Sequence, residues 1–216
     1  MIEQRQKEIN LCLIHNLSHN LTATLTIIYN NPVVEHYLNL IRLPKREKLR
    51  LVYLSGEPTL RRQMLHISKY MQGKTIILMH MDNQLGEGTD LIDTKRFQSG
   101  GICYALTRRV KENTCTNPTY GTCNEGVHYT GSHDAFVFSF PKKLPESTFD
   151  MLTFSSNSIG QENALIYFFK MVLHYKVQNP CKIVQIMHTH CGVRMYSSGG
   201  RVNKRLSAVA PPSPKL

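Results

Sequence analysis

Short apolar runs that end in polar or glycine residues recur along the chain and predict β-strands. Residues 49–56 (LRLVYLSG) alternate in part between apolar and polar positions and end in glycine, which is typical of a strand that runs into a turn. Residues 75–81 (TIILMHM) and 181–187 (CKIVQIM) are almost wholly apolar, which predicts strands covered on both faces of a sheet. Further strands are expected near residues 102–106, 135–140 and 150–154.

Two segments have apolar residues at helical spacing. Thr59 can cap a helix that extends to Tyr70, because its side-chain oxygen can accept from a free backbone N–H of the first turn. The apolar face of that helix is made by Leu60, Met64, Ile67 and Met71. Residues 164–175 repeat the same spacing, and their Phe and Met side chains are expected in the core. Residues 1–25 are polar and predict a helix or an arm.

The alternation of strands and helices predicts an α/β fold, with a central mixed sheet flanked by helices on both faces. We expect residues 75–79 and 182–187 to be neighbouring strands at its centre. An N-terminal arm or helix (1–25), a main domain (26–200) and a C-terminal tail (201–216) make up the expected organisation. The tail is basic and then rich in proline, which is typical of a disordered segment.

The charge of the chain favours anionic partners. Lys and Arg number 26 against 15 for Asp and Glu in 216 residues, so the formal net charge is +11. A positive field of this kind attracts phosphorylated or acidic proteins, nucleic acids and acidic membrane surfaces. No aromatic stacking platform accompanies Lys204, Arg205 and Lys215 of the tail, so nucleic acid is the weaker expectation.

The N-terminal residues and the cysteines suggest a reducing compartment. The first 20 residues lack the apolar stretch of a secretory signal, and no apolar run approaches the ~18 residues of a membrane span. The six cysteines are therefore expected to be reduced thiols, in the cytoplasm or alternatively in the nucleus. In such a compartment the glycosylation sequons at Asn16 and Asn20 are chance matches.

Several segments resemble, in the right order, those of protein tyrosine phosphatases. The matching segments are NNPVVEHYLNLIRL (30–43), VYLSGEP (52–58), ISKYMQGKTIILM (67–79), GGICY (100–104), FDMLTFSSNSIG (149–160) and ALIYFFKMVLHY (164–175). In that family the helix that residues 164–175 resemble leads to a buried strand. The strand is followed by a loop with the pattern His-Cys, five residues, Arg. The backbone N–H groups of this loop hold a phosphate group, and the Cys thiolate of the loop attacks that phosphate.

The catalytic positions of that family are altered in this chain. HTHCGV (188–193) is similar to the start of the phosphatase loop, but Thr189 stands where the nucleophilic Cys is expected. Met195 occupies the Arg position, and Arg194 takes it only if one residue is deleted. Ile159 stands at the position of the general acid and cannot protonate a leaving group. The resemblance therefore implies an inactive phosphatase that does not hydrolyse aryl phosphates.

What the resemblance implies is a binding or scaffolding module with a tyrosine phosphatase-like fold that is shortened after Gly200. It is expected to use no cofactor and no metal, and to bind a phosphorylated or acidic protein. The binding residues expected on this basis are His188, Thr189, His190, Cys191, Gly192, Val193 and Arg194.

Three other interpretations stay open at this point. A divergent phosphatase could use Cys191, or Cys103, which is followed after five residues by Arg109. A basic nucleic-acid-binding domain is the second. The third is a zinc site, for which the spacing is poor. Its loosely spaced candidate ligands are Cys115, Cys123, His128 and His133, with His188, His190 and Cys191 as another cluster.

Overall fold

The computed structural model describes residues 2–110, 123, 133–156, 158–189, 202, 207–213 and 215–216. The α-helices are α1 (Ile2–Ser18), α2 (Pro32–Leu40), α3 (Leu60–Tyr70), α4 (Thr94–Gln98) and α5 (Gln161–Tyr167). The strands are β1 (Leu25–Tyr29), β2 (Leu49–Tyr53), β3 (Ile76–Met79), β4 (Asn83–Leu85), β5 (Ile102–Leu106), β6 (Arg109–Val110), β7 (Ala135–Phe138), β8 (Lys176–Gln178) and β9 (Ile186–His188).

Short helical turns complete the secondary structure. Turns of 3₁₀ helix lie at Arg46–Lys48, Thr89–Leu91 and Glu146–Leu152, and a π-helical turn, Phe168–Val172, follows α5 directly. Within the described ranges, no helix has both the length and the apolar character needed to cross a membrane.

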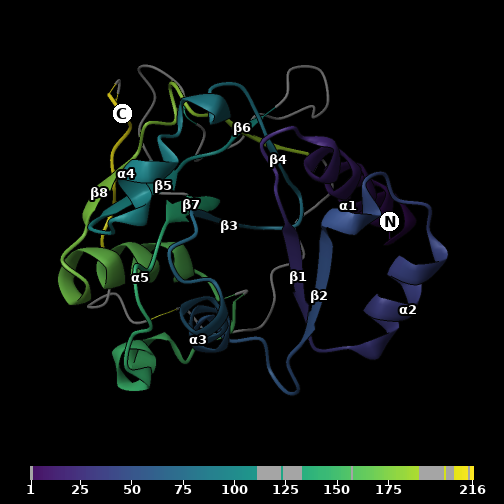
Figure 1. The fold of residues 1–216 in the computed structure, drawn as a ribbon, viewed down its shortest axis with the longest axis horizontal. Helices are drawn as coiled ribbons and strands as arrows, with labels where there is room; N and C mark the ends of the chain where they lie inside the picture. The colour runs from purple at the N-terminus through teal and green to yellow at the C-terminus, as the bar shows by residue number, and fades with distance from the viewer. Residues whose placement is uncertain are drawn as a thin grey trace.

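The strands form three sheets rather than one. A mixed sheet has the order β3-β7-β5-β8, in which β7 is antiparallel to both neighbours and β8 is parallel to β5. A parallel pair, β1-β2, and a small sheet of order β4-β9-β6 lie beside it (Figure 1). The predicted α/β class, with helices and mixed sheets, is confirmed, but the expected single sheet is divided.

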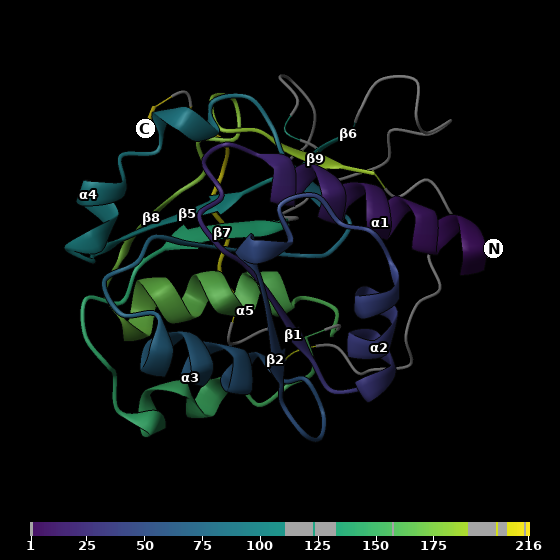
Figure 2. The same cartoon turned by 45° about the vertical axis from the view of Figure 1, so that its right-hand side comes forward.

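Strand β7 is the centre of the core because both of its faces are buried. Phe136 and Phe138 face a cluster built with α3, α5 and Phe149 of the 3₁₀ turn, whereas Ala135 and Val137 face a second cluster that includes Phe97 of α4. Figure 2 shows α3 and α5 together on one side of this sheet. Alternating side chains of one strand thus build two apolar layers.

A third core joins the N-terminal part of the chain. Leu13 and Leu17 of α1 and Leu38 of α2 pack against Ile27 of β1 and Leu49 of β2. These elements lie together on the right of Figure 1. Strand β1 begins at Leu25, the last residue of the region expected to be an arm or helix, and was not predicted.

Several local predictions are confirmed. The strands expected near 49–56, 75–81, 102–106 and 135–140 are present as β2, β3, β5 and β7. Helix α3 begins after Thr59, whose hydroxyl accepts from the backbone N–H of Arg62 at 3.3 Å. A side-chain cap and an apolar stripe are both local signals, which is why the sequence predicted this helix well.

The predicted strand at 150–154 is wrong. This segment continues the 3₁₀ turn Glu146–Leu152, in which Phe149 and Leu152 are fully buried. A spacing of three residues matches the 3₁₀ repeat and turns both side chains to the core.

The expected central pairing of 75–79 with 182–187 is also wrong. Strand β3 is an edge strand of the mixed sheet, and β9 lies in the small sheet between β4 and β6. Of the predicted strand 181–187, only Ile186 and Met187 lie in β9. The residues before them form a turn, because the N–H groups of Ile183 and Val184 both donate to the carbonyl of Pro180.

The C-terminal tail packs on the domain where it is described, in contrast to the expected disorder. Ala210 is buried, and its carbonyl accepts from the side chain of Asn179 at 2.9 Å. Pro212 forms a bridge with Asn179, and Lys170 donates to the carbonyl of Val209. Ala210 therefore belongs to the core, with Ala208 packed against it, whereas Val209 is exposed.

Gly88, in the segment before α4, packs closely on the backbone of the turn before β9, and a substitution at Gly88 tests this contact. Its φ is +74°, and an added Cβ would lie 2.0 Å from the carbonyl oxygen of Ile183. Gly73 has a similar φ of +67° but open space around it. We expect Gly73→Ala to cost about 1–2 kcal/mol of unfolding free energy from backbone strain alone. Gly88→Ala should cost about 3 kcal/mol or more, because a backbone contact must also break. Equal losses in urea unfolding would contradict this packing.

Candidate functional site

Polar and charged residues gather at one edge of the mixed sheet. Strands β3 and β5 end at this edge, and β7 begins there, because β7 runs antiparallel to both. Ligand sites of α/β proteins commonly lie where strands end in this way. The described residues that the three strands and the first turn of α5 deliver are His80, Asp82, Asn83, Arg108, Asp134, Gln161 and Glu162.

Asp82 makes several hydrogen bonds at this edge. Its Oδ2 accepts from Nη2 of Arg5 at 2.6 Å and lies 3.1 Å from Nε2 of His188. Its backbone carbonyl accepts from both the N–H and the hydroxyl of Thr189, at 3.1 and 3.0 Å. Arg5 also donates to Glu8 at 3.2 Å. The cluster therefore joins α1 and β9 to the end of β3.

These contacts keep Asp82 ionised. Burial alone would raise the pKa of this carboxyl group, but the hydrogen bond and charge of His188, followed by those of Arg5, outweigh burial and hold the pKa far below its usual range. Asp82 is thus negatively charged at neutral pH.

A second buried ion pair lies beside the first cluster. Nη1 of Arg108 donates to Oδ1 of Asp134 at 2.9 Å, and both side chains are over nine-tenths buried. The carbonyl of Asp134 accepts from the N–H of His80 and from the side-chain amide of Asn83, at 3.4 and 3.3 Å. Asp134 therefore connects the ends of β3 and β5.

Two buried polar atoms of this edge have no hydrogen-bond partner among the described residues. They are Nε of Arg108, a donor, and Oδ1 of Asn83, an acceptor. Buried polar groups are normally satisfied, and exceptions commonly mark sites that bind water or a ligand. Arg108 contacts the carboxylate of Asp134 and Asn83 contacts its backbone carbonyl, so the two residues are neighbours of the same aspartate.

Glu162 has the opposite electrostatic setting to Asp82. It is half-buried in the first turn of α5, next to Gln161, whose side-chain amide lies 3.5 Å from a ring nitrogen of His80. Burial raises the pKa of Glu162, and the negative charge of Asp134 adds to this rise. Its own backbone N–H and the charges of His80 and Arg108 oppose the shift without cancelling it.

The edge thus holds two carboxyl groups whose pKa values are displaced in opposite directions. A carboxylate that stays ionised can hold and orient charged or polar groups. A carboxyl group with a raised pKa can exchange a proton nearer to neutral pH. Pairs of this kind are typical of acid–base catalytic sites.

The structure describes only part of the predicted phosphate-binding loop. His188 and Thr189 lie at the end of β9, bound to Asp82. Ile159 is 45% exposed just before α5. His190, Cys191, Gly192, Val193, Arg194 and Met195 lie outside the described residues. His188 thus contacts the carboxylate of Asp82, and Thr189 donates to its backbone carbonyl.

Cys103 is poorly suited to the nucleophilic role considered for it. The side chain is fully buried in β5, and burial raises the pKa of the thiol well above its usual value. Arg109, the other half of the motif, donates to the carbonyls of Cys181 and Lys182 at 3.4 Å. The pattern Cys, five residues, Arg is therefore a strand sequence here. Its cysteine is a core residue.

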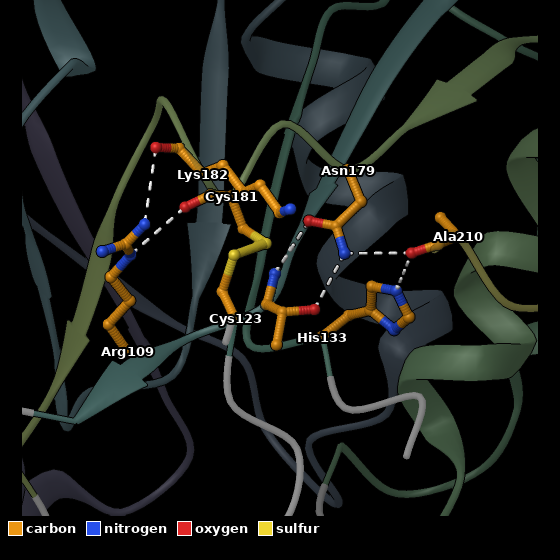
Figure 3. Close-up of a disulfide and its surroundings, with 8 residues drawn as sticks. Arg109, Cys123, His133, Asn179, Cys181, Lys182 and Ala210 are labelled. Carbon is orange, nitrogen blue, oxygen red and sulfur yellow. Dashed lines mark hydrogen bonds between the residues drawn. A yellow bond between two sulfur atoms is a disulfide. The ribbon is translucent and has the colours of Figure 1, made fainter. Parts of the chain in front are cut away.

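A disulfide joins Cys123 to Cys181, which contradicts the expected reduced state of these two cysteines (Figure 3). The bond also makes Cys123 unsuitable as a zinc ligand. Nε2 of His133, another residue of that loose set, lies 3.1 Å from the carbonyl of Ala210. Cys115 and His128 lie outside the described residues, and within the described ranges no group of three metal ligands occurs. The spacing of the cysteines gave no signal for this pairing.

The sequence contains a signal for the polar edge. His80 and Asp82 follow the apolar run 75–79, Arg108 follows β5, and Asp134 precedes β7 directly. Polar residues at the ends of predicted strands are candidates for one shared edge. The contribution of Arg5 could not be found in this way, because it lies 77 residues from Asp82.

Comparison with protein-family models, with curated proteins and with solved structures gave no match.

Replacing Asp82 by Asn tests the tie between α1, β3 and β9. We expect Asp82→Asn to lower the unfolding free energy at pH 7 by about 2 kcal/mol, below the range for a fully buried pair because Arg5 is a third exposed. Because the folded-state pKa of Asp82 is depressed, the wild-type advantage should be complete above about pH 5 and shrink as the pH falls below about 4. Chemical unfolding of the wild type and of Asp82→Asn at several pH values measures this difference in unfolding free energy.

The matched control is Asp150→Asn, which removes the carboxylate of an exposed ion pair with Arg61. That variant should lose less than about 1 kcal/mol. Equal losses of unfolding free energy in the two variants, or a loss in Asp82→Asn that does not depend on pH, would contradict a stabilising role for the contacts of Asp82 with Arg5 and His188.

Proposed function

We propose that the polar edge is the active centre of an acid–base enzyme that catalyses hydrolysis or group transfer to a hydroxyl group. The observation that carries the proposal is the half-buried Glu162, with its raised pKa, beside the Arg108–Asp134 ion pair. A carboxyl group in this setting can take a proton from an attacking water or alcohol, and can return it to a leaving group.

The other residues of the edge have supporting roles in this proposal. Arg108 holds Asp134, whose negative charge keeps the affinity of Glu162 for a proton high. The free donor of Arg108 and the free acceptor of Asn83 suit a hydroxyl group, which can accept from one and donate to the other. Asp82 fixes the end of β3 so that these groups keep their positions.

A second candidate function is the non-catalytic binding module that the resemblance to tyrosine phosphatases implies. It is favoured by a pocket of about 220 Å³ beside α3, where Arg62, Lys69 and Lys143 outnumber Glu146. Such a surface suits an acidic or phosphorylated side chain. The tyrosine phosphatase-like fold and the binding loop at 188–194 stay predictions that accompany this candidate.

Glu162→Gln tests the enzymatic proposal against generic probes. We expect the wild type to hydrolyse at least one member of a panel of 4-nitrophenyl acetate and 4-nitrophenyl glycosides, and the variant to lose about 10²–10⁴-fold in kcat. Stability should be kept or increased at pH 7, because ionisation of a carboxyl group with a raised pKa opposes folding. Spectrophotometric rates and chemical unfolding measure the two effects.

The control is Glu57→Gln, at an exposed residue, which should leave both rate and stability unchanged. A structural role for Glu162 would instead appear as a loss of stability in Glu162→Gln. Absence of turnover on every probe, combined with salt-sensitive binding of a phosphotyrosine peptide that Lys69→Gln weakens, would favour the binding module.

A further inference from the structure

Two N-glycosylation sequons lie four residues apart near the end of α1. They are Asn16-Leu17-Ser18 and Asn20-Leu21-Thr22, and both satisfy the pattern of asparagine, any residue except proline, then serine or threonine. The sequence gives no reason to prefer one of them. The structure separates them sharply.

Asn16 is a structural residue of the fold. It is buried to 4% exposure, its Nδ2 donates to the carbonyl of Asn83 at 2.8 Å, and its Oδ1 accepts from the N–H of Leu85 at 3.0 Å. These bonds dock α1 on β4. The side chain is too deeply buried to leave space for a glycan on Nδ2, so the folded protein cannot carry one at Asn16.

Asn20 has the properties that Asn16 lacks. It lies in an exposed turn that the N–H of Thr22 closes on the carbonyl of His19 at 3.1 Å. Leu21 beside it is 54% exposed. Among the described residues, the Asn20 side chain makes no hydrogen bond. Its amide can therefore carry a large substituent without loss of a native contact.

The disulfide supplies an independent observation about the compartment. Cys123–Cys181 joins residues 58 apart in the sequence. Disulfides form and persist in oxidising environments such as the secretory route, and are rare in the cytosol. Glycosylation of sequons occurs on that same route. The two features, one in the core and one on the surface, point to the same compartment.

We infer that Asn20 is an N-glycosylation site of this chain and that Asn16 is not, which places the chain on the secretory route. In the modification, Nδ2 of Asn20 loses one proton to a base of the transferring enzyme and forms a bond to the anomeric carbon of an oligosaccharide. The bond from that carbon to the pyrophosphate of a glycosyl pyrophosphate donor breaks, and the pyrophosphate leaves with the electron pair.

The position of Asn20 is compatible with the proposed active centre. Asn20 follows the C-terminal end of α1, whereas Arg5, which contacts Asp82, lies near the N-terminal end. At 1.5 Å per residue the two are about 20 Å apart along the helix. A glycan on Asn20 therefore lies away from the Arg5–Asp82 contact, although Asn16, one helical turn before it, contacts Asn83 of the same edge. The inference does not depend on the proposed enzymatic function.

The test is expression of the full chain behind a cleavable secretory leader in mammalian cells, followed by enzymatic deglycosylation and peptide mass spectrometry of the secreted protein. We expect one glycan on the wild type, with Asn20 converted to Asp by the deglycosylating amidase. Ser18→Ala destroys the first sequon without changing Asn16 and should keep the glycan. Thr22→Ala and Asn20→Gln should both lose it.

The same peptide maps report the state of the cysteines. The secreted wild type is expected to contain the Cys123–Cys181 disulfide. A glycan-free secreted wild type, a glycan on Asn16, or free thiols at Cys123 and Cys181 would each overturn the inference.

Discussion

The carboxylate of Asp82 joins parts of the chain that are distant in the sequence. Arg5 comes from α1 and His188 from β9, 77 and 106 residues away, and both contact the same oxygen. Asn16 makes a second connection from α1 to the neighbouring strand β4. The small sheet and the N-terminal helix are thereby held against the mixed sheet, whose own core is built from aromatic side chains around β7. The positions of the polar groups at the sheet edge depend on these contacts of Asp82 and Asn16.

The polar edge carries a cost in stability that the apolar core offsets. An ion pair over nine-tenths buried, Arg108–Asp134, contributes little net stability, because desolvation opposes the attraction between its charges. A carboxyl group with a raised pKa, Glu162, opposes folding at neutral pH. Concentrations of such groups at the end of a sheet are typical of functional sites, where affinity for a proton or a ligand is maintained at the expense of stability.

Local signals in the sequence predicted local structure. The Thr59 cap and the apolar stripe of α3 lie within one short segment, and the β7 run is buried on both faces as its composition indicates. Strand order could not be predicted in this way. The near-identical apolar character of 75–79 and 182–187 suggested partners, but β7 pairs with β3 instead, and the turn after Pro180 shortens β9. Composition reports how deeply a strand is buried. It does not report which strand lies beside it.

Contacts between distant residues explain what the sequence missed at the site. The pairing of Cys123 with Cys181 and that of Arg5 with Asp82 cannot be predicted from their separation in the sequence. Loops of very different lengths can bring two distant residues together at a similar cost in entropy. Asp82, Arg108 and Asp134 could have been found from their positions beside predicted strands. The raised pKa of Glu162 depends on burial and on Asp134, and both are properties of the folded chain alone.

Titration of Glu162 by ¹³C NMR of its side-chain carboxyl carbon tests the account most directly. The account predicts a midpoint above the ordinary value of about 4.3 in the wild type. It also predicts a lower midpoint in Asp134→Asn, because that substitution removes the nearby negative charge and frees the positive charge of Arg108. A midpoint at or below the ordinary value, unchanged in Asp134→Asn, would contradict the claim that this edge of the sheet is an acid–base centre.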